Sequence, residues 1–158
     1  MDNAEPIRSS PKLNKKAIGI KYGIFTSAAM IGYFLLMAMF NLVAVVELRM
    51  LNYVFIGLGI WLALWEVEKK EPGHLVRYLP GMGVGFWVSG IAAIIFAIFI
   101  MLYGTINKSF VPEIRQSMPY SPYLPPSLVA FETLSETIIV SIIINLIVLF
   151  IRPGQVKD

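Results

Sequence analysis

Four long apolar stretches dominate the chain. They cover residues 22–46, 50–66, 79–103 and 127–151, and the first and third contain no charged residue. About 20 helical residues cross a bilayer core of ~30 Å, so three of the stretches are long enough to span it. The stretch over 50–66 is shorter, and we expect Arg49 at its start to reach back to the headgroups. A soluble amphipathic helix keeps a polar face. The pattern therefore predicts an all-α membrane protein, a bundle of four transmembrane helices in up-down-up-down order.

The polar segments divide the chain into a membrane domain and two tails. We predict an N-terminal tail over 1–17, a four-helix domain over 18–152 and a C-terminal tail over 153–158. The turn after the second stretch is charged, and Pro72 and Gly73 are expected to break the helix there.

The outer loop over 104–126 contains five prolines, which stiffen it. Aromatic side chains stand among these prolines, namely Phe110, Tyr120 and Tyr123. The loop is therefore either a contact platform for a partner or a stiff segment resting on the headgroups.

Positive charges lie mostly on one side of the predicted bundle. Of the 13 lysines and arginines, only Arg49, Lys108 and Arg115 fall in the segments on the opposite side. Because cytoplasmic segments carry the excess of Lys and Arg, both termini are predicted to be cytoplasmic. The formal net charge of +3 then reflects membrane orientation and contact with anionic lipid, so we predict no nucleic-acid partner.

Signatures of catalysis, cofactors and metals are missing from the sequence. There is no cysteine, and the single histidine, His74, stands in a charged turn without clustered ligands. The stretch Gly81-Met-Gly-Val-Gly-Phe lacks the third glycine and the preceding strand of a dinucleotide-binding loop. We therefore predict that the protein is not an enzyme and binds no cofactor or metal.

Small residues recur at helical spacing in the third stretch: Gly81, Gly85, Ser89 and Ala92. Such a stripe lets helix backbones approach closely, which matters because lipid gives helices no hydrophobic reason to associate. The stripe is a candidate helix-packing face. Packing within the bundle is the favoured interpretation, and docking of a partner or a second copy is the alternative.

The candidate intramembrane polar site consists of Glu132, Glu136, Asn145 and Glu47. Glu132 and Glu136 are four residues apart and share a helical face. Only about 22 Å of helix follows Glu136, so this carboxylate is expected to lie near the hydrocarbon boundary. It either belongs to a proton or cation site or is an interfacial carboxylate that is solvated by headgroups, stabilised by the helix N-terminus or paired with Arg49. The interfacial interpretation is favoured. For Asn145 we favour a hydrogen bond to a neighbouring helix.

The sequence also resembles a known family. The segment Gly73-His-Leu-Val-Arg-Tyr-Leu-Pro-Gly-Met-Gly-Val-Gly, the start Lys21-Tyr-Gly-Ile and the ending at Arg152 carry the resemblance. They are similar to an uncharacterised family of small four-helix bacterial inner-membrane proteins, a domain of unknown function. The similarity covers most of residues 18–152 and rests on hydropathy and glycine placement. It implies a multi-pass protein of the bacterial inner membrane and supplies no active site.

Two functions are compatible with these features. The first is an accessory or structural subunit of a larger inner-membrane complex, with membrane lipids and other membrane subunits or a second copy as partners. The alternative is a small proton- or ion-coupled transporter or conduit that uses Glu132 and Glu136.

Overall fold

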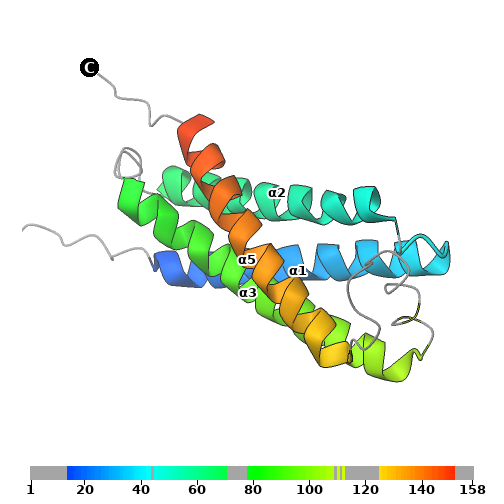
Figure 1. The fold of residues 1–158 in the computed structure, drawn as a ribbon. Helices are drawn as coiled ribbons and strands as arrows, with labels where there is room; N and C mark the ends of the chain where they lie inside the picture. The colour runs from blue at the N-terminus through cyan, green and yellow to red at the C-terminus, as the bar shows by residue number, and fades with distance from the viewer. Residues whose placement is uncertain are drawn as a thin grey trace, which may run out of the picture.

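The computed structural model describes residues 14–43, 45–70, 78–108, 110, 112 and 125–151. Within these residues the chain forms four helices long and apolar enough to cross a membrane. They are α1 (Lys15–Met39), α2 (Val46–Lys70), α3 (Tyr78–Ile106) and α5 (Pro126–Ile151) (Figure 1). This result confirms the prediction of an all-helical chain with four helices long and apolar enough to cross a membrane.

The first helix begins earlier than the hydropathy pattern predicted. Asn14 caps it, because its side-chain oxygen accepts a hydrogen bond of 3.1 Å from the backbone N–H of Ala17. Residues 15–17, assigned to the N-terminal tail from the sequence, are therefore helical.

The same helix also ends earlier, at Met39 instead of residue 46. Asn41 adopts a left-handed conformation with φ of 56°. Its N–H bonds to the carbonyl of Ala38 at 3.2 Å, and the N–H of Leu42 bonds to the carbonyl of Met37 at 2.9 Å. These two bonds are the Schellman pattern that closes a helix C-terminus. A turn that begins at residue 40 thus replaces part of the predicted first span.

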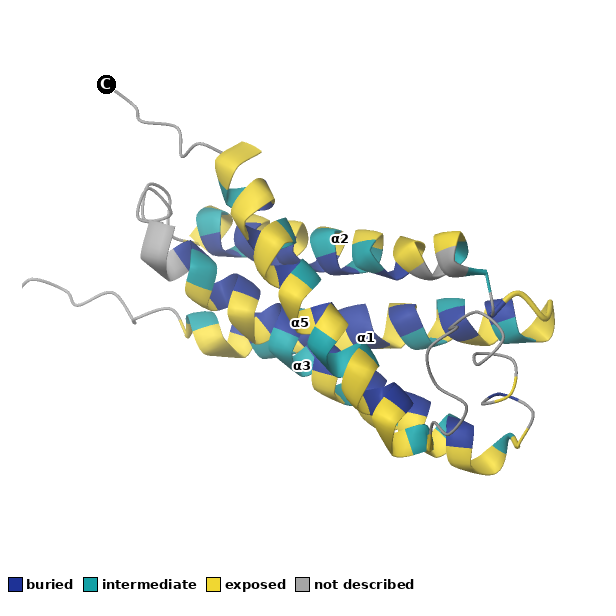
Figure 2. Cartoon of the chain, viewed as in Figure 1, coloured by how far each residue is buried: buried dark blue, intermediate teal, exposed yellow. Residues whose placement is uncertain are grey.

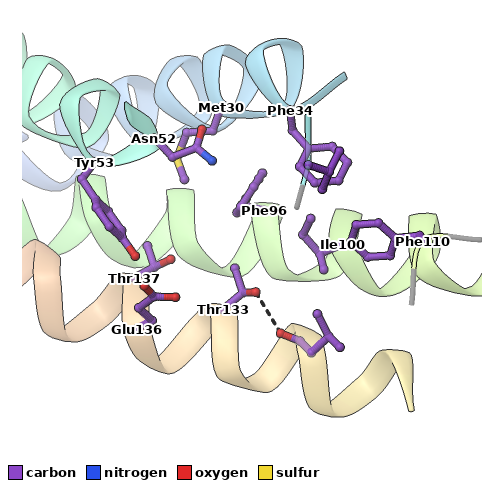
Figure 3. Close-up of a pocket in the computed structure, with 12 residues that line it drawn as sticks. Met30, Phe34, Asn52, Tyr53, Phe96, Ile100, Phe110, Thr133, Glu136 and Thr137 are labelled. Carbon is purple, nitrogen blue, oxygen red and sulfur yellow. Dashed lines mark hydrogen bonds between the residues drawn. The ribbon is translucent and has the colours of Figure 1, made fainter. Parts of the chain in front are cut away.

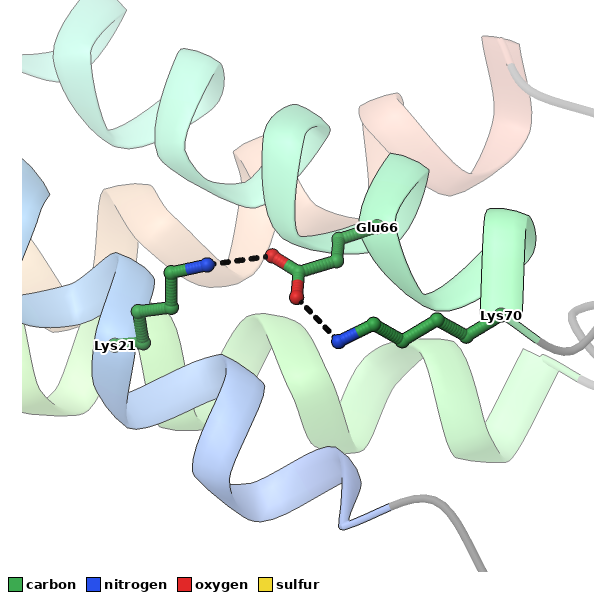
Figure 4. A network of polar contacts seen from close by, with 3 residues as sticks. All are labelled: Lys21, Glu66 and Lys70. Atoms are coloured by element: carbon green, nitrogen blue, oxygen red, sulfur yellow. Dashed lines mark hydrogen bonds and ion pairs between the residues drawn. The ribbon is translucent and has the colours of Figure 1, made fainter.

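The second helix is longer than predicted at both ends. It continues through Glu66 to Lys70, residues that the sequence placed in a charged turn. The carboxylate of Glu66 accepts hydrogen bonds from the Nζ atoms of Lys21 at 3.0 Å and Lys70 at 2.7 Å (Figure 4). The contact between Lys21 near the start of α1 and Glu66 near the end of α2 makes these two helices antiparallel.

Helix α3 lies at the centre of the bundle and packs extensively against α1 and α5, while α2 contacts all three other helices (Figure 1). Glycine permits the closest of these approaches. A Cβ atom at Gly23 of α1 would lie 2.8 Å from Cβ of Ile91 and 2.9 Å from the carbonyl oxygen of Val88, both on α3. The α1–α3 contact therefore depends on the missing side chain.

An aromatic cluster closes the end of the bundle next to the outer loop. Phe34 contacts Tyr103 and Phe110 edge-on, with ring centroids 5.1 Å and 5.6 Å apart. Phe110 is only 2% exposed, so it packs into the bundle and is not available to the contact platform considered above. Tyr120 and Tyr123, the other aromatic residues of that platform, lie outside the described residues.

The outward faces of the helices are apolar. Large exposed hydrophobic side chains run along them, including Phe25, Leu58, Ile98 and Ile139 (Figure 2). Contiguous exposed apolar surface of this extent is typical of a membrane-embedded chain.

Candidate functional site

A small cavity with several polar groups in a mostly apolar wall lies inside the bundle, and all four helices contribute to this wall. Its volume is about 40 Å³. Twelve residues line it: Met30, Phe34, Val43, Asn52, Tyr53, Phe96, Ile100, Phe110, Val129, Thr133, Glu136 and Thr137 (Figure 3). A water molecule needs roughly 10–15 Å³ of such space, so the cavity can hold two or three waters or a small ion.

Asn52 of α2 is the most unusual side chain in the cavity wall. It is 7% exposed, and its Oδ1 atom has no hydrogen-bond partner among the described residues. Leaving a buried acceptor unsatisfied costs about 1–3 kcal/mol. Native proteins rarely leave such an acceptor unsatisfied, so the amide of Asn52 is the polar group of this cavity wall that most needs a partner.

Glu136 of α5 lines the same cavity but is itself exposed, which places it at the cavity mouth. It lies ten residues after Pro126, about 15 Å along a helix of about 39 Å. If α5 is centred in the bilayer, this carboxylate falls within the hydrocarbon layer, where an acid costs roughly 2.5–3.5 kcal/mol on insertion scales. Acidic residues at such depths normally face a polar interior or water, and the cavity supplies that environment.

Hydroxyl groups complete the polar part of the wall. Thr133 and Thr137 lie about one helical turn apart on α5, close to Glu136, and Tyr53 follows Asn52 on α2 (Figure 3). The Thr133 hydroxyl donates to the carbonyl of Val129 at 2.8 Å. This bond uses its proton and leaves its oxygen lone pairs free to accept.

Oxygen atoms supply most of the polar groups of this wall. Among the described lining residues these groups are one carboxylate, one amide and three hydroxyls. Nowhere in the described part of the chain do three or more His, Cys, Asp or Glu side chains gather into a potential metal site. The described wall therefore combines hydroxyl and amide groups with the carboxylate of Glu136.

Of the four residues proposed from the sequence, only Glu136 lines this cavity. Glu132 is exposed one turn earlier on α5, and Glu47 is exposed in the first turn of α2. Asn145 lies nine residues beyond Glu136, about 13 Å along α5, where its Nδ2 donates to the carbonyl of Met82 at 3.2 Å. The structure does not bring the four residues together.

The sequence interpretation missed Asn52, which lines the same cavity as Glu136. In the sequence this residue is distinguished only as an amide within an apolar stretch. Asn41 and Asn145 carry that same signal, and one ends a helix while the other bonds to a neighbouring one. The role of each asparagine depends on what faces it.

The candidate packing face is buried inside the bundle. Gly81, Gly85, Ser89 and Ala92 are all buried, and the Ser89 hydroxyl donates to the carbonyl of Gly85 at 2.9 Å. A Cβ atom at Gly85 would collide with the amide group of Asn145. These residues therefore contact the chain's own helices and leave little surface for a partner.

A second concave surface opens outward between α2 and α5. It is an apolar groove of about 430 Å³, lined by Tyr53, Val54, Gly57, Leu58, Trp61, Ile144 and Val148. Gly57 lies in its wall, where a Cβ atom would approach Ile144 no closer than 3.4 Å. The wall of the groove therefore has no side chain at Gly57. Glycine is a residue type that allows two helices to approach closely.

Comparison with known proteins provides no family for this chain, because no protein-family model, curated protein or solved structure matches it.

Proposed function

We propose that the chain is an accessory or structural subunit of a larger complex in the bacterial inner membrane, with its helices alternating in direction across the bilayer and both termini in the cytoplasm. The observation that carries this proposal is the apolar groove between α2 and α5. It lies on two membrane-crossing helices and has a glycine in its wall. In lipid, close packing at small residues is what holds helices together, so the groove fits a transmembrane helix of a partner subunit.

The small-residue stripe lies inside the bundle, which reduces the surface on which a partner can bind. Gly81, Gly85, Ser89 and Ala92 are buried among the chain's own helices. The groove, by contrast, is an apolar surface that lies open beside a glycine. A partner helix in it would contact Leu58 and Trp61 of α2 and Ile144 of α5.

Filling the groove tests the proposal. Gly57→Phe should place a ring in the groove without disturbing the fold, because its Cβ atom has ordinary contact distances. Gly32→Phe is the matched control, since a Cβ atom at this exposed position of α1 has no neighbour within 4 Å. Purified in mild detergent, the wild type and the control should migrate as one larger complex on native gels, and Gly57→Phe should migrate as the lone chain. A lone chain in all three preparations contradicts the proposal.

The orientation has its own test. Reporter fusions that distinguish cytoplasm from periplasm are placed after Asp158 and after Lys108. The excess of Lys and Arg at the α1 start and α2 end predicts a cytoplasmic signal at Asp158 and a periplasmic one at Lys108. The reverse pattern of reporter signals would contradict the proposed topology.

The polar cavity favours a second candidate function, a small ion conduit or ion-coupled transporter. Its support is the exposed Glu136 at the mouth and the amide oxygen of Asn52, which has no hydrogen-bond partner among the residues that the structure describes. Proteoliposomes containing the purified protein should then show a cation flux that Glu136→Gln abolishes and Glu132→Gln leaves intact. The absence of any flux contradicts this function.

A further inference from the structure

We propose that two lysine–tryptophan pairs at one end of the bundle bind the headgroups of anionic phospholipids. In the first pair, the Nζ atom of Lys16 on α1 lies 4.5 Å from the centroid of the Trp87 ring on α3. In the second, the Nζ atom of Lys69 lies 3.6 Å from the centroid of the Trp65 ring, one turn earlier on α2. The inference goes beyond the proposed function and does not depend on a partner subunit.

Both pairs lie at the end of the bundle where α1 begins and α2 ends. The ion pair between Lys21 and Glu66 holds these two helix ends together. Lys16 stands five residues before Lys21, toward the start of α1. Lys69 stands three residues after Glu66, toward the end of α2. Lysine and tryptophan at the ends of membrane-crossing helices are typical of the headgroup level.

A comparison of four lysines at this end shows why these two carry the proposal. Lys21 and Lys70 both pair with the carboxylate of Glu66, whose negative charge offsets half of theirs (Figure 4). Within the part of the chain that the structure describes, neither Lys16 nor Lys69 forms an ion pair with an acidic side chain. Their positive charges are therefore the ones left for an external anion.

A tryptophan ring positions a lysine ammonium group without neutralising it. The ring attracts a cation through its quadrupole and carries no net charge. The ammonium group has three N–H donors, and only one side of it faces the ring, so donors remain for phosphate oxygens. Trp65 and Trp87 are 45% and 39% exposed, and both lysines are exposed as well. A headgroup can therefore reach both pairs.

The neighbouring surface selects a lipid as the source of the phosphate. Leu62 stands about one turn from Trp65 on α2, toward the middle of the helix, and is 43% exposed. Ile94 stands about two turns from Trp87 on α3, again toward the middle of the helix, and is 51% exposed. Each pair thus has open apolar surface on its membrane side. An acyl chain below a bound phosphate covers this surface, which a free phosphate ion does not.

Quenching of tryptophan fluorescence by brominated lipid measures the contact. The chain has three tryptophans, so Trp61→Phe combined with Trp87→Phe leaves Trp65 as the reporter. This protein is reconstituted in phosphatidylcholine that contains a small fraction of brominated phosphatidylglycerol, or the same fraction of brominated phosphatidylcholine. Phosphatidylglycerol should bind at the reporter about fivefold more strongly than phosphatidylcholine, because one lysine near the surface contributes about that factor.

Lys69→Gln should remove this preference at the Trp65 reporter. Lys70→Gln is the matched control, because it removes the same charge from the adjacent position, and it should keep the preference. The absence of a preference in the parent protein overturns the proposal. An equal loss in Lys69→Gln and Lys70→Gln also overturns it, since the attraction would then come from the general surface charge.

The first pair is tested in the same way with Trp87 as the reporter, after Trp61→Phe and Trp65→Phe. Here Lys16→Gln should remove the preference and Lys21→Gln should keep it. Excess inorganic phosphate should leave the quenching unchanged at both reporters. Quenching that free phosphate reverses would show a site for a soluble anion and would overturn the assignment to lipid.

A second measurement keeps the test decisive if a protein with two tryptophans replaced fails to fold. Native mass spectrometry of the chain with all its tryptophans counts the phosphatidylglycerol molecules that remain bound after release from mixed micelles. Lys16→Gln and Lys69→Gln should each retain fewer of them than the wild type, whereas Lys21→Gln and Lys70→Gln should retain the wild-type number. Equal retention in all four variants overturns the proposal.

Discussion

The side-chain amide of Asn145 on α5 fills the space that a side chain at Gly85 of α3 would occupy. The Nδ2 atom of the same residue donates to the carbonyl of Met82, one turn earlier on α3. The polar contact and the close approach therefore occur at one point of the α3–α5 interface. A single methyl group added at Gly85 is therefore expected to disturb the packing of α3 against α5.

Gly85→Ala should destabilise the protein by about 1–3 kcal/mol, because the added methyl group overpacks against the Asn145 amide. The free energy of unfolding in mixed detergent micelles, followed by helical circular dichroism, measures the effect. Gly83→Ala is the control, since no neighbouring atom lies within 4 Å of a Cβ atom there. Equal stability of the two variants would refute the close α3–α5 contact.

The turn after α1 predicts a contrast between two substitutions of Asn41. Its φ of 56° lies in the left-handed region, which glycine adopts freely and β-branched residues avoid. Asn41→Gly should leave the stability nearly unchanged, whereas Asn41→Val should cost about 1–2 kcal/mol. The same unfolding assay checks both variants. Valine tolerated as well as glycine would argue against the observed helix end.

The ion pairs of Glu66 should contribute a small, salt-dependent stabilisation. The side chains of Lys21 and Lys70 are 53% and 49% exposed and that of Glu66 is 17% exposed, so solvent screens both pairs. Each pair should be worth no more than about 1 kcal/mol. A double-mutant cycle with Lys21→Met and Glu66→Gln measures the coupling, which should shrink as salt rises toward about 1 M. Coupling that is insensitive to salt would contradict this account.

Phe110 should hold the beginning of the outer loop against the bundle. Phe110→Ala removes ring contacts with Phe34 and Tyr103 and should cost about 3–5 kcal/mol. It should also speed protease cleavage in the outer loop. Ile106→Ala provides the comparison, because Ile106 is 82% exposed. Cleavage at the wild-type rate in Phe110→Ala would show that this anchor is dispensable.

Hydropathy located the four helices but not all of their ends. The signal for membrane crossing is the summed apolarity of some 20 residues, which tolerates a shift of several positions. Asn41 shows the difficulty: an amide inside an apolar run changes the sum little, yet its backbone conformation ends α1. The sequence suggested a charged turn after Glu66, whereas α2 continues to Lys70. The Glu66 carboxylate there accepts a hydrogen bond from Lys21 across the helix interface, a contact that no local pattern predicts.

The candidate site was harder to predict, because a cavity arises from three-dimensional packing. The sequence predicted Glu136 as a site residue because it is a carboxylate near an apolar stretch, and the structure places it at the cavity mouth. Asn52, 84 positions earlier in the chain, is brought to the same cavity by the contact between α2 and α5. No local pattern links these two residues.

The contacts between α1 and α2 also bear on how these two helices fold. The Tyr33 hydroxyl of α1 donates to the carbonyl of Leu48 in α2 at 2.9 Å, and Lys21 pairs with Glu66 at the other end of the two helices. Between these ends Thr26 of α1 lies so close to Gly59 of α2 that a Cβ atom at Gly59 would collide with the Thr26 hydroxyl. The α1–α2 pair therefore has contacts of its own along its length, and we expect it to associate as a hairpin without help from α3 or α5.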